Sequence, residues 1–141
     1  MKKISLLLIL LLMGCSFSME KDARSETYTD PQQVIDAIKE AQRSKYKNYL
    51  FLDLREEIDE YIKGFHNTPP SEIDAYLEGL KTYTFIMVFS NSNELTSERV
   101  SYIQSKGFNN VKYIDITVET LLNALRDVDL LYNESCPPKG C

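Results

Sequence analysis

The sequence predicts an α/β domain with a central, mainly parallel sheet and helices on both of its faces. Two apolar runs, residues 49–54 and 83–89, lack the apolar–polar alternation of a half-exposed strand, so both strands are expected to be buried on both faces. Helical patterns separate these runs from each other and from a third strand at residues 110–116. Strands separated by helices of this length need right-handed crossovers, which build a parallel sheet.

The first helix has a clear start signal. Asp30 can act as an N-cap acid, Pro31 suits the first helical position, and Gln33 completes a capping box. The helix is expected to end near Ser44. Its inward face holds Val34, Ile35, Ile38 and Ala41.

The remaining elements follow in order. After the strand at 49–54, residues 56–62 are expected to form a short helix that Gly64 ends. Ser71 can cap a further helix, whose inward stripe is Ile73, Tyr76, Leu77 and Leu80. The strand at 83–89 leads into a helix at 93–106, and the strand at 110–116 leads into a last helix at 117–132.

The amino terminus predicts export and lipid anchoring. Two lysines precede an apolar stretch at residues 6–13, which is too short for a spanning helix of roughly 20 residues, so residues 1–14 are interpreted as a signal peptide. The sequence Leu12-Met13-Gly14-Cys15 resembles the bacterial lipobox, in which the cysteine is acylated and becomes the first residue. The alternative is an ordinary signal peptide with an incidental Cys15. Ser16 is not the aspartate that favours inner-membrane retention, so we expect the periplasmic face of the outer membrane in an organism with two membranes.

The predicted mature chain is strongly acidic. Loss of Lys2 and Lys3 lowers the net charge from −5 to −7, which argues against nucleic acid and anionic lipid as partners. Residues 15–29 are expected to form the lipidated cysteine and a polar tether, residues 30–132 a single domain, and residues 133–141 a tail. The expected contact with the membrane is through the lipid on Cys15.

Residues 30–125 resemble the rhodanese-like domain. Four segments carry the resemblance, in the order of that family: Leu52-Asp53-Leu54-Arg55-Glu56; Gly64, Asn67 and Pro69 leading into Ser71-Glu72-Ile73; Val88-Phe89; and Gly107-Phe108 with Val111. The resemblance implies an α/β sulfurtransferase fold. It also implies that Asp53 and Arg55 are structural, holding the end of a strand to neighbouring loops.

The chain departs from this family at the reactive position. In active members the central strand ends in a cysteine that carries the transferred sulfur, and here that position is Ser90. A hydroxyl cannot hold the persulfide and is barely ionised near pH 7, so no sulfurtransferase chemistry is expected from Ser90. The active-site-like loop is Ser90, Asn91, Ser92, Asn93, Glu94, Leu95 and Thr96.

Further differences surround the same loop. Asn91 and Leu95 occupy positions where the family tends to carry arginines for an anionic substrate, and Glu94 adds a charge that opposes an anion. Tyr61 stands where the family carries a histidine, and the paired glycines expected near Asp115 are missing. Together these differences predict a domain that kept the fold and lost the reaction.

Two other candidate sites carry polar or reactive side chains. His66, the single histidine, is expected to be a loop surface residue, and a Ser90–His66 hydrolase would lack the Gly-x-Ser-x-Gly elbow. Cys136 and Cys141 are the two cysteines left after acylation of Cys15, and a disulfide between them is the expected pairing in an oxidising compartment. Their spacing is not Cys-x-x-Cys and no histidine is near, so a metal site is not expected, and no cofactor is expected either.

The functional prediction is a lipid-anchored, catalytically inactive rhodanese-like domain that works as a binding or scaffolding module in the bacterial cell envelope. A protein of the envelope is one candidate partner, and surface tyrosines would suit such a contact. Tyr46, Tyr49, Tyr61, Tyr76 and Tyr83 cluster in the first half of the domain. Two alternatives stay open: a sulfurtransferase or thiol-redox protein that uses Cys136 or Cys141, and a receptor for a small polar ligand around Ser90.

Overall fold

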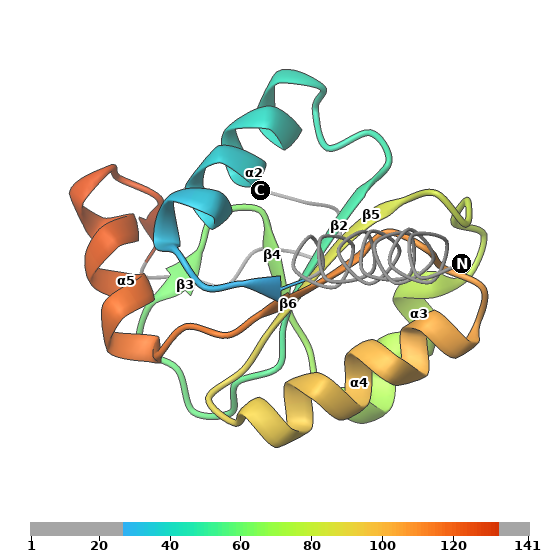
Figure 1. Cartoon of the computed structure of the whole chain (residues 1–141). Helices are drawn as coiled ribbons and strands as arrows, with labels where there is room; N and C mark the ends of the chain where they lie inside the picture. Colours follow the sequence, from blue (N-terminus) through green and yellow to red (C-terminus); the bar gives the residue numbers. More distant parts are fainter. Residues whose placement is uncertain (1–26, 133–141) are drawn as a thin grey trace, which may run out of the picture.

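The computed structural model describes residues 27–132, and its centre is a five-stranded parallel sheet (Figure 1). The strand order is β1 (Thr27–Tyr28), β6 (Val111–Ile114), β5 (Phe85–Phe89), β2 (Tyr49–Asp53) and β4 (Phe65–Asn67). All four neighbouring pairs are parallel. The predicted fold class, an α/β domain with a mainly parallel sheet, is confirmed.

Helices cover both faces of this sheet, as Figure 1 shows. On one face lie α2 (Pro31–Arg43) and α5 (Val118–Asp127), which contact each other. On the other face lie α3 (Ile73–Leu77), which follows the 3₁₀ turn η1 (Pro70–Glu72), and α4 (Asn93–Ser105). A separate antiparallel pair, β3 (Tyr61–Ile62) with β7 (Leu131–Tyr132), lies beside the sheet.

The sheet divides the core into two layers. The layer under α2 and α5 contains Phe51, Met87 and Phe89, and the layer under α3 and α4 contains Leu52 and Val88. The apolar residues of β2 and β5 therefore alternate between the two layers and are buried in both. This is the double burial that the continuous apolar runs predict.

The amino-terminal helix forms as predicted. Asp30 accepts a hydrogen bond from the Gln32 N–H at 2.9 Å, and the Gln33 side chain accepts from the Asp30 N–H at 3.1 Å, which completes the capping box. The predicted helix at 93–106 is also confirmed as α4, with Lys106 as its C-cap.

The segment 56–62 does not form the predicted helix. Glu57 has a φ of +37°, a left-handed conformation that interrupts a helix, and Tyr61 and Ile62 pair with β7 instead. Four acids within five residues also repel each other on a short helix. Gly64 does not end a helix: it lies between β3 and β4 with φ +83°, where an added Cβ would come within 2.7 Å of the Tyr46 ring.

Other element boundaries also differ from the predictions, and β5, β6 and α3 are shorter than expected. The last helix ends at Asp127, because Asp129 adopts a φ of +58° and the Leu130 N–H then bonds to the Leu125 carbonyl. Thr27 and Tyr28, within the predicted tether, pair with β6 as an edge strand. The Ser71 side chain makes no cap hydrogen bond, because the 3₁₀ turn begins before it.

Within residues 27–132, no helix has both the length and the apolar character needed to cross a bilayer.

Candidate functional site

A buried ion pair organises the carboxyl end of β2. Asp53 ends this strand with 1% of its side chain exposed, and the Arg55 side chain is 5% exposed. The Arg55 Nη2 atom lies 2.6 Å from Asp53 Oδ2, and Nε lies 2.9 Å from Oδ1. The Arg55 N–H also donates to Oδ1 at 3.1 Å. This fork geometry compensates two charges that burial alone would penalise.

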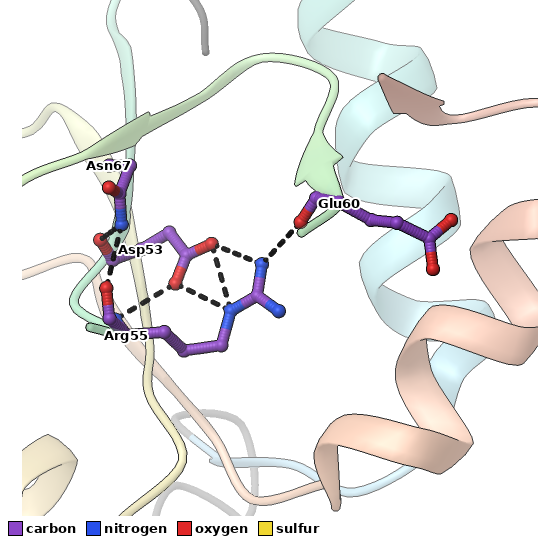
Figure 2. A network of polar contacts seen from close by, with 4 residues as sticks. All are labelled: Asp53, Arg55, Glu60 and Asn67. Carbon is purple, nitrogen blue, oxygen red and sulfur yellow. Dashed lines mark hydrogen bonds and ion pairs between the residues drawn. The ribbon is translucent and has the colours of Figure 1, made fainter. Parts of the chain in front are cut away.

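Neighbouring loops are attached to this pair, as Figure 2 shows. The Asn67 side chain donates to the carbonyls of Asp53 at 3.0 Å and Arg55 at 2.9 Å, so it holds the end of β4 against the end of β2. Arg55 Nη2 also donates to the Glu60 carbonyl at 3.0 Å. That contact fixes the loop that follows β2.

The Ser90 hydroxyl is directed into its own loop. Ser90 is 4% exposed and follows β5 directly. Its Oγ accepts from the Ser92 N–H at 3.0 Å, donates to the Ser92 carbonyl at 2.7 Å, and lies 2.7 Å from the Thr96 hydroxyl. The hydroxyl of Thr96, a residue 1% exposed, lies 3.1 Å from the same carbonyl, and its single proton goes either to that carbonyl or to Ser90 Oγ. The two hydroxyls therefore connect the start of the loop to the first turn of α4.

The rest of this loop caps α4 and faces solvent. The Ser92 hydroxyl accepts from the Leu95 N–H at 3.3 Å, which makes Ser92 the N-cap. Asn91, Asn93 and Glu94 are exposed, and Leu95 is half-buried. The carboxylate of Glu94 in the first turn already complements the helix dipole, so it competes with any external anion there.

An open pocket of about 400 Å³ lies beside the loop that follows β2. We call it the acidic cleft, and its lining is residues 55–60, Asn91, Val118 and Leu122. Glu56, Glu57 and Asp59 are exposed on its rim. A second pocket of about 420 Å³ shares residues 55–58 and continues toward Tyr61 and Pro69. The structure thus brings Asn91 to a pocket together with Arg55, whereas Ser90 lines neither of these pockets.

His66 is not the surface loop residue that was expected. It lies within β4, paired with Leu52, and its ring contacts Tyr76 at a centroid distance of 5.2 Å. Burial lowers the pKa of His66 below its ordinary value, which favours the neutral ring. The hydrogen bonds of Ser90 to described residues all stay within its own loop, so the geometry does not assemble a Ser90–His66 pair.

Some predicted site residues lie outside the described range. These are Cys15, Cys136 and Cys141. Among residues 27–132, no group of three or more histidines, cysteines or acids is arranged to hold a metal ion. The surface tyrosines differ in exposure: Tyr83 is 58% exposed, whereas Tyr46 and Tyr49 pack against the core layer under α2.

Sequence reasoning missed the residues that shape the acidic cleft. The segment 56–60 was expected to be helical, and α5 was not expected to contribute Val118 and Leu122. The concentration of Glu56, Glu57, Asp59 and Glu60 was the available signal, because neighbouring like charges are unfavourable in a short helix. The ion pair of Glu60 with Arg126 of α5 has no comparable local signal.

Comparisons with solved structures find similar α/β domains. A full-length protein from Lactobacillus plantarum has a TM-score of 0.56 at 14% identity, over 86% of this chain and 98% of that chain. The Rhodanese_3-like domain of the Alr3790 protein from Anabaena sp. has a TM-score of 0.47 at 23% identity, over 63% and 96%. A solution structure of the rhodanese-like domain of that protein gives 0.48 at 22% identity, over 75% and 83%.

No protein-family model matches the chain, and a search of curated proteins finds no match. The similarity to the Lactobacillus plantarum protein agrees with the α/β fold class. Rhodanese-like domains are among the other structures found.

Proposed function

We propose that this chain is a lipid-anchored binding module of the bacterial cell envelope, built on a rhodanese-like fold without sulfurtransferase activity. The observation that carries the proposal is the burial and hydrogen bonding of Ser90, the residue that follows the central strand. Its hydroxyl is buried and its hydrogen bonds are made within residues 90–96. Such a group is neither a sulfur carrier nor an accessible nucleophile.

The charges around the cleft also argue against the sulfur-transfer reaction. Thiosulfate is an anion, and the loop from Ser90 to Thr96 contains no lysine or arginine to hold it. Glu56, Glu57 and Asp59 on the cleft rim would repel it. Two guanidinium groups lie near the cleft, and both are already paired: Arg55 with Asp53 and Arg126 with Glu60.

A sulfurtransferase assay tests this proposal. Residues 15–141 carrying Cys15→Ser are expected to transfer no sulfur from thiosulfate to cyanide, measured as thiocyanate. The same chain with Ser90→Cys is also expected to be inactive, because it gains a thiol but no cation for the substrate.

Two outcomes of this assay would contradict parts of the proposal. Thiocyanate formation by the Ser90 chain, lost in Cys136→Ser or Cys141→Ser, would place the chemistry in the tail. Activity gained by Ser90→Cys alone would mean that the loop still cradles an anion, contrary to the charge argument.

The proposed anchor predicts a cysteine-dependent membrane location. The full chain expressed in a bacterium is expected to take up labelled palmitate and to sediment with membranes, because acyl chains contribute roughly 0.8 kcal/mol per buried CH₂. The Cys15→Ser variant should lose the label. Because cleavage before residue 15 depends on the acylated cysteine, this variant should also keep residues 1–14. Cys136→Ser is the matched control and should keep the label. Equal labelling of the Cys15→Ser variant would reject the anchor.

A further inference from the structure

We propose that the amino edge of the sheet docks on an anionic lipid surface, so that the opposite edge faces away from the membrane. This inference rests on the proposed lipid anchor and deepens it, because it assigns the anchored domain an orientation. Three observations support it: the fold places opposite charges on the two edges, an exposed tyrosine lies among the lysines, and the chain from Cys15 enters the sheet from that edge.

Three loops lie together at the amino edge, because parallel strands all begin at the same edge of a sheet. We call them the amino-edge loops: residues 44–48 before β2, 78–84 before β5 and 106–110 before β6. The Phe85 N–H donates to the Asn48 carbonyl at 2.9 Å, which joins the first two loops. The Asn109 N–H donates to the Thr82 carbonyl at 3.3 Å, which joins the second and third. Figure 1 shows the loops before β5 and β6 on the same side of the sheet.

The amino-edge loops are basic. They contain a single acid, Glu78, and four lysines: Lys45, Lys47, Lys81 and Lys106. All four lysines are exposed. The Lys106 Nζ atom lies 5.2 Å from the centre of the Tyr102 ring. The other three lysines form no ion pair with any residue in the range 27–132, so their charges are available to an external anion.

The segments that follow the same three strands carry the opposite charge. Residues 54–60, 90–95 and 115–119 contain no lysine, and their one arginine, Arg55, is paired with Asp53. Their exposed acids are Glu56, Glu57, Asp59, Glu94, Asp115 and Glu119. The net charge that argued against anionic lipid is therefore the sum of a basic edge and a more strongly acidic one. An anionic bilayer attracts the first edge and repels the second, which favours one orientation of the domain.

An exposed aromatic side chain on the amino edge suits the surface of a bilayer. Tyr83 lies in the loop between Lys81 and β5, and it is 58% exposed. Among residues 27–132, only Tyr83 and Val128 are large hydrophobic residues with exposed side chains. Tyrosine is enriched at membrane–water interfaces, where its ring contacts apolar groups and its hydroxyl stays hydrated. Lysines alone would suit any polyanion, whereas lysines around an exposed ring are typical of interfacial membrane contacts.

The direction of β1 places the proposed anchor on the same side. β1 is parallel to β6, with Thr27 opposite Tyr113, so the chain enters this strand from the amino edge. Eleven residues separate Cys15 from Thr27. A segment of that length spans at most about 40 Å. The lipid on Cys15 would therefore keep the amino-edge loops close to the bilayer, and a weak attraction would be enough, because docking of an anchored domain is intramolecular.

A tryptophan placed at each edge tests this orientation. The chain has no tryptophan, so Tyr83→Trp and Asn91→Trp each introduce a unique fluorophore, one before β5 and one after it. Both variants are made in residues 15–141 with Cys136→Ser and Cys141→Ser, and each is coupled through Cys15 to a maleimide lipid. The vesicles are phosphatidylcholine, alone or with about 30 mol % phosphatidylglycerol as the anionic lipid. Part of the phosphatidylcholine carries brominated acyl chains, which quench tryptophan on contact.

The two positions are expected to respond differently to anionic lipid. On vesicles with phosphatidylglycerol, the Tyr83→Trp chain should show blue-shifted and quenched emission, whereas the Asn91→Trp chain should not. Phosphatidylcholine alone should leave both emissions unchanged. The quenching at position 83 should weaken as salt rises from about 50 mM to about 300 mM, because screening shortens the range of the lysine charges. Circular dichroism checks that each variant keeps its fold, since both positions are exposed.

A charge-matched pair of variants of the Tyr83→Trp chain separates the amino edge from the net charge. The edge variant carries Lys45→Gln and Lys81→Gln. The control carries Lys39→Gln and Arg126→Gln, which removes the same number of positive charges at exposed positions outside the amino-edge loops. The edge variant should lower the ratio of docked to undocked domain on the order of 25-fold, since each lysine near an anionic surface contributes roughly a fivefold factor. The control should dock as the parent does.

Three results would overturn the inference: equal quenching at both positions, quenching that needs no phosphatidylglycerol, or equal losses in the two charge variants. A fourth is an emission shift of the Tyr83→Trp chain with tetraglutamate but not with vesicles, which would assign the edge to an acidic protein segment. Chemical coupling supplies the anchor here, so the palmitate experiment keeps the two proposals apart. A chain that takes up palmitate but does not dock loses the inference alone, whereas a chain that docks but takes up no palmitate loses the proposed anchor.

Discussion

Replacing Asp53 with alanine is expected to lower the free energy of unfolding by about 3–5 kcal/mol, because Arg55 would remain buried without its counter-charge. Both side chains are at least 94% buried, and the carboxylate also accepts the Arg55 N–H. Its loss would release the loop that Arg55 fixes through the Glu60 carbonyl. Urea unfolding followed by circular dichroism at pH 7 measures the change.

Two controls accompany this prediction. Glu40→Ala removes an ion pair with Arg43 in which both side chains are more than half exposed, and it should cost at most about 1 kcal/mol. The double variant Asp53→Leu with Arg55→Met removes both charges and should recover much of the lost stability. If Asp53→Ala behaves like Glu40→Ala, the buried pair does not stabilise this edge of the sheet.

Replacing Phe51 with alanine is expected to lower the free energy of unfolding by about 3–5 kcal/mol, because apolar burial is lost and a cavity is left behind. Phe51 is 1% exposed, and its ring contacts those of Tyr46, Tyr49, Phe65 and Phe85 at centroid distances between 5.2 and 6.3 Å. It therefore joins β2 to both neighbouring strands and to the segment after α2. The same urea experiment measures the loss.

An exposed aromatic residue provides the comparison for Phe51. Tyr83 is 58% exposed, and Tyr83→Ala should change the free energy of unfolding by about 0.5 kcal/mol or less. Phe51→Leu should lie between the two, since it keeps part of the buried volume. A loss from Phe51→Ala no greater than that from Tyr83→Ala would show that the ring cluster does not support the core.

Elements determined by local sequence were predictable. The capping box of α2 involves residues three apart, and the burial of β2 and β5 follows from their continuous apolar composition. The segment 56–62 was not predictable from local pattern. Tyr61 and Ile62 pair with Tyr132 and Leu131, about half the chain away, and this contact overrides a weak helical preference.

In the candidate site, too, features set by local sequence were predictable and features set by the folded chain were not. The sequence shows that Ser90 directly follows the apolar run of the central strand, and that its loop contains no lysine or arginine. The inward direction of its hydroxyl depends on Ser92 and Thr96, two and six positions later, whose spacing only the folded loop explains. The acidic cleft depends on α5, which no local pattern places beside residues 55–60.

The parallel pairing of β1 with β6 has a consequence for the order of folding. Thr27 pairs with Tyr113 and Tyr28 with Ile114, so the two strands are far apart in the sequence, and closing so long a loop costs entropy before any pairing energy is gained. A ribosome delivers the amino end first. Thr27 and Tyr28 therefore have no strand partner until β6 has been synthesised. The edge strand of the sheet forms late.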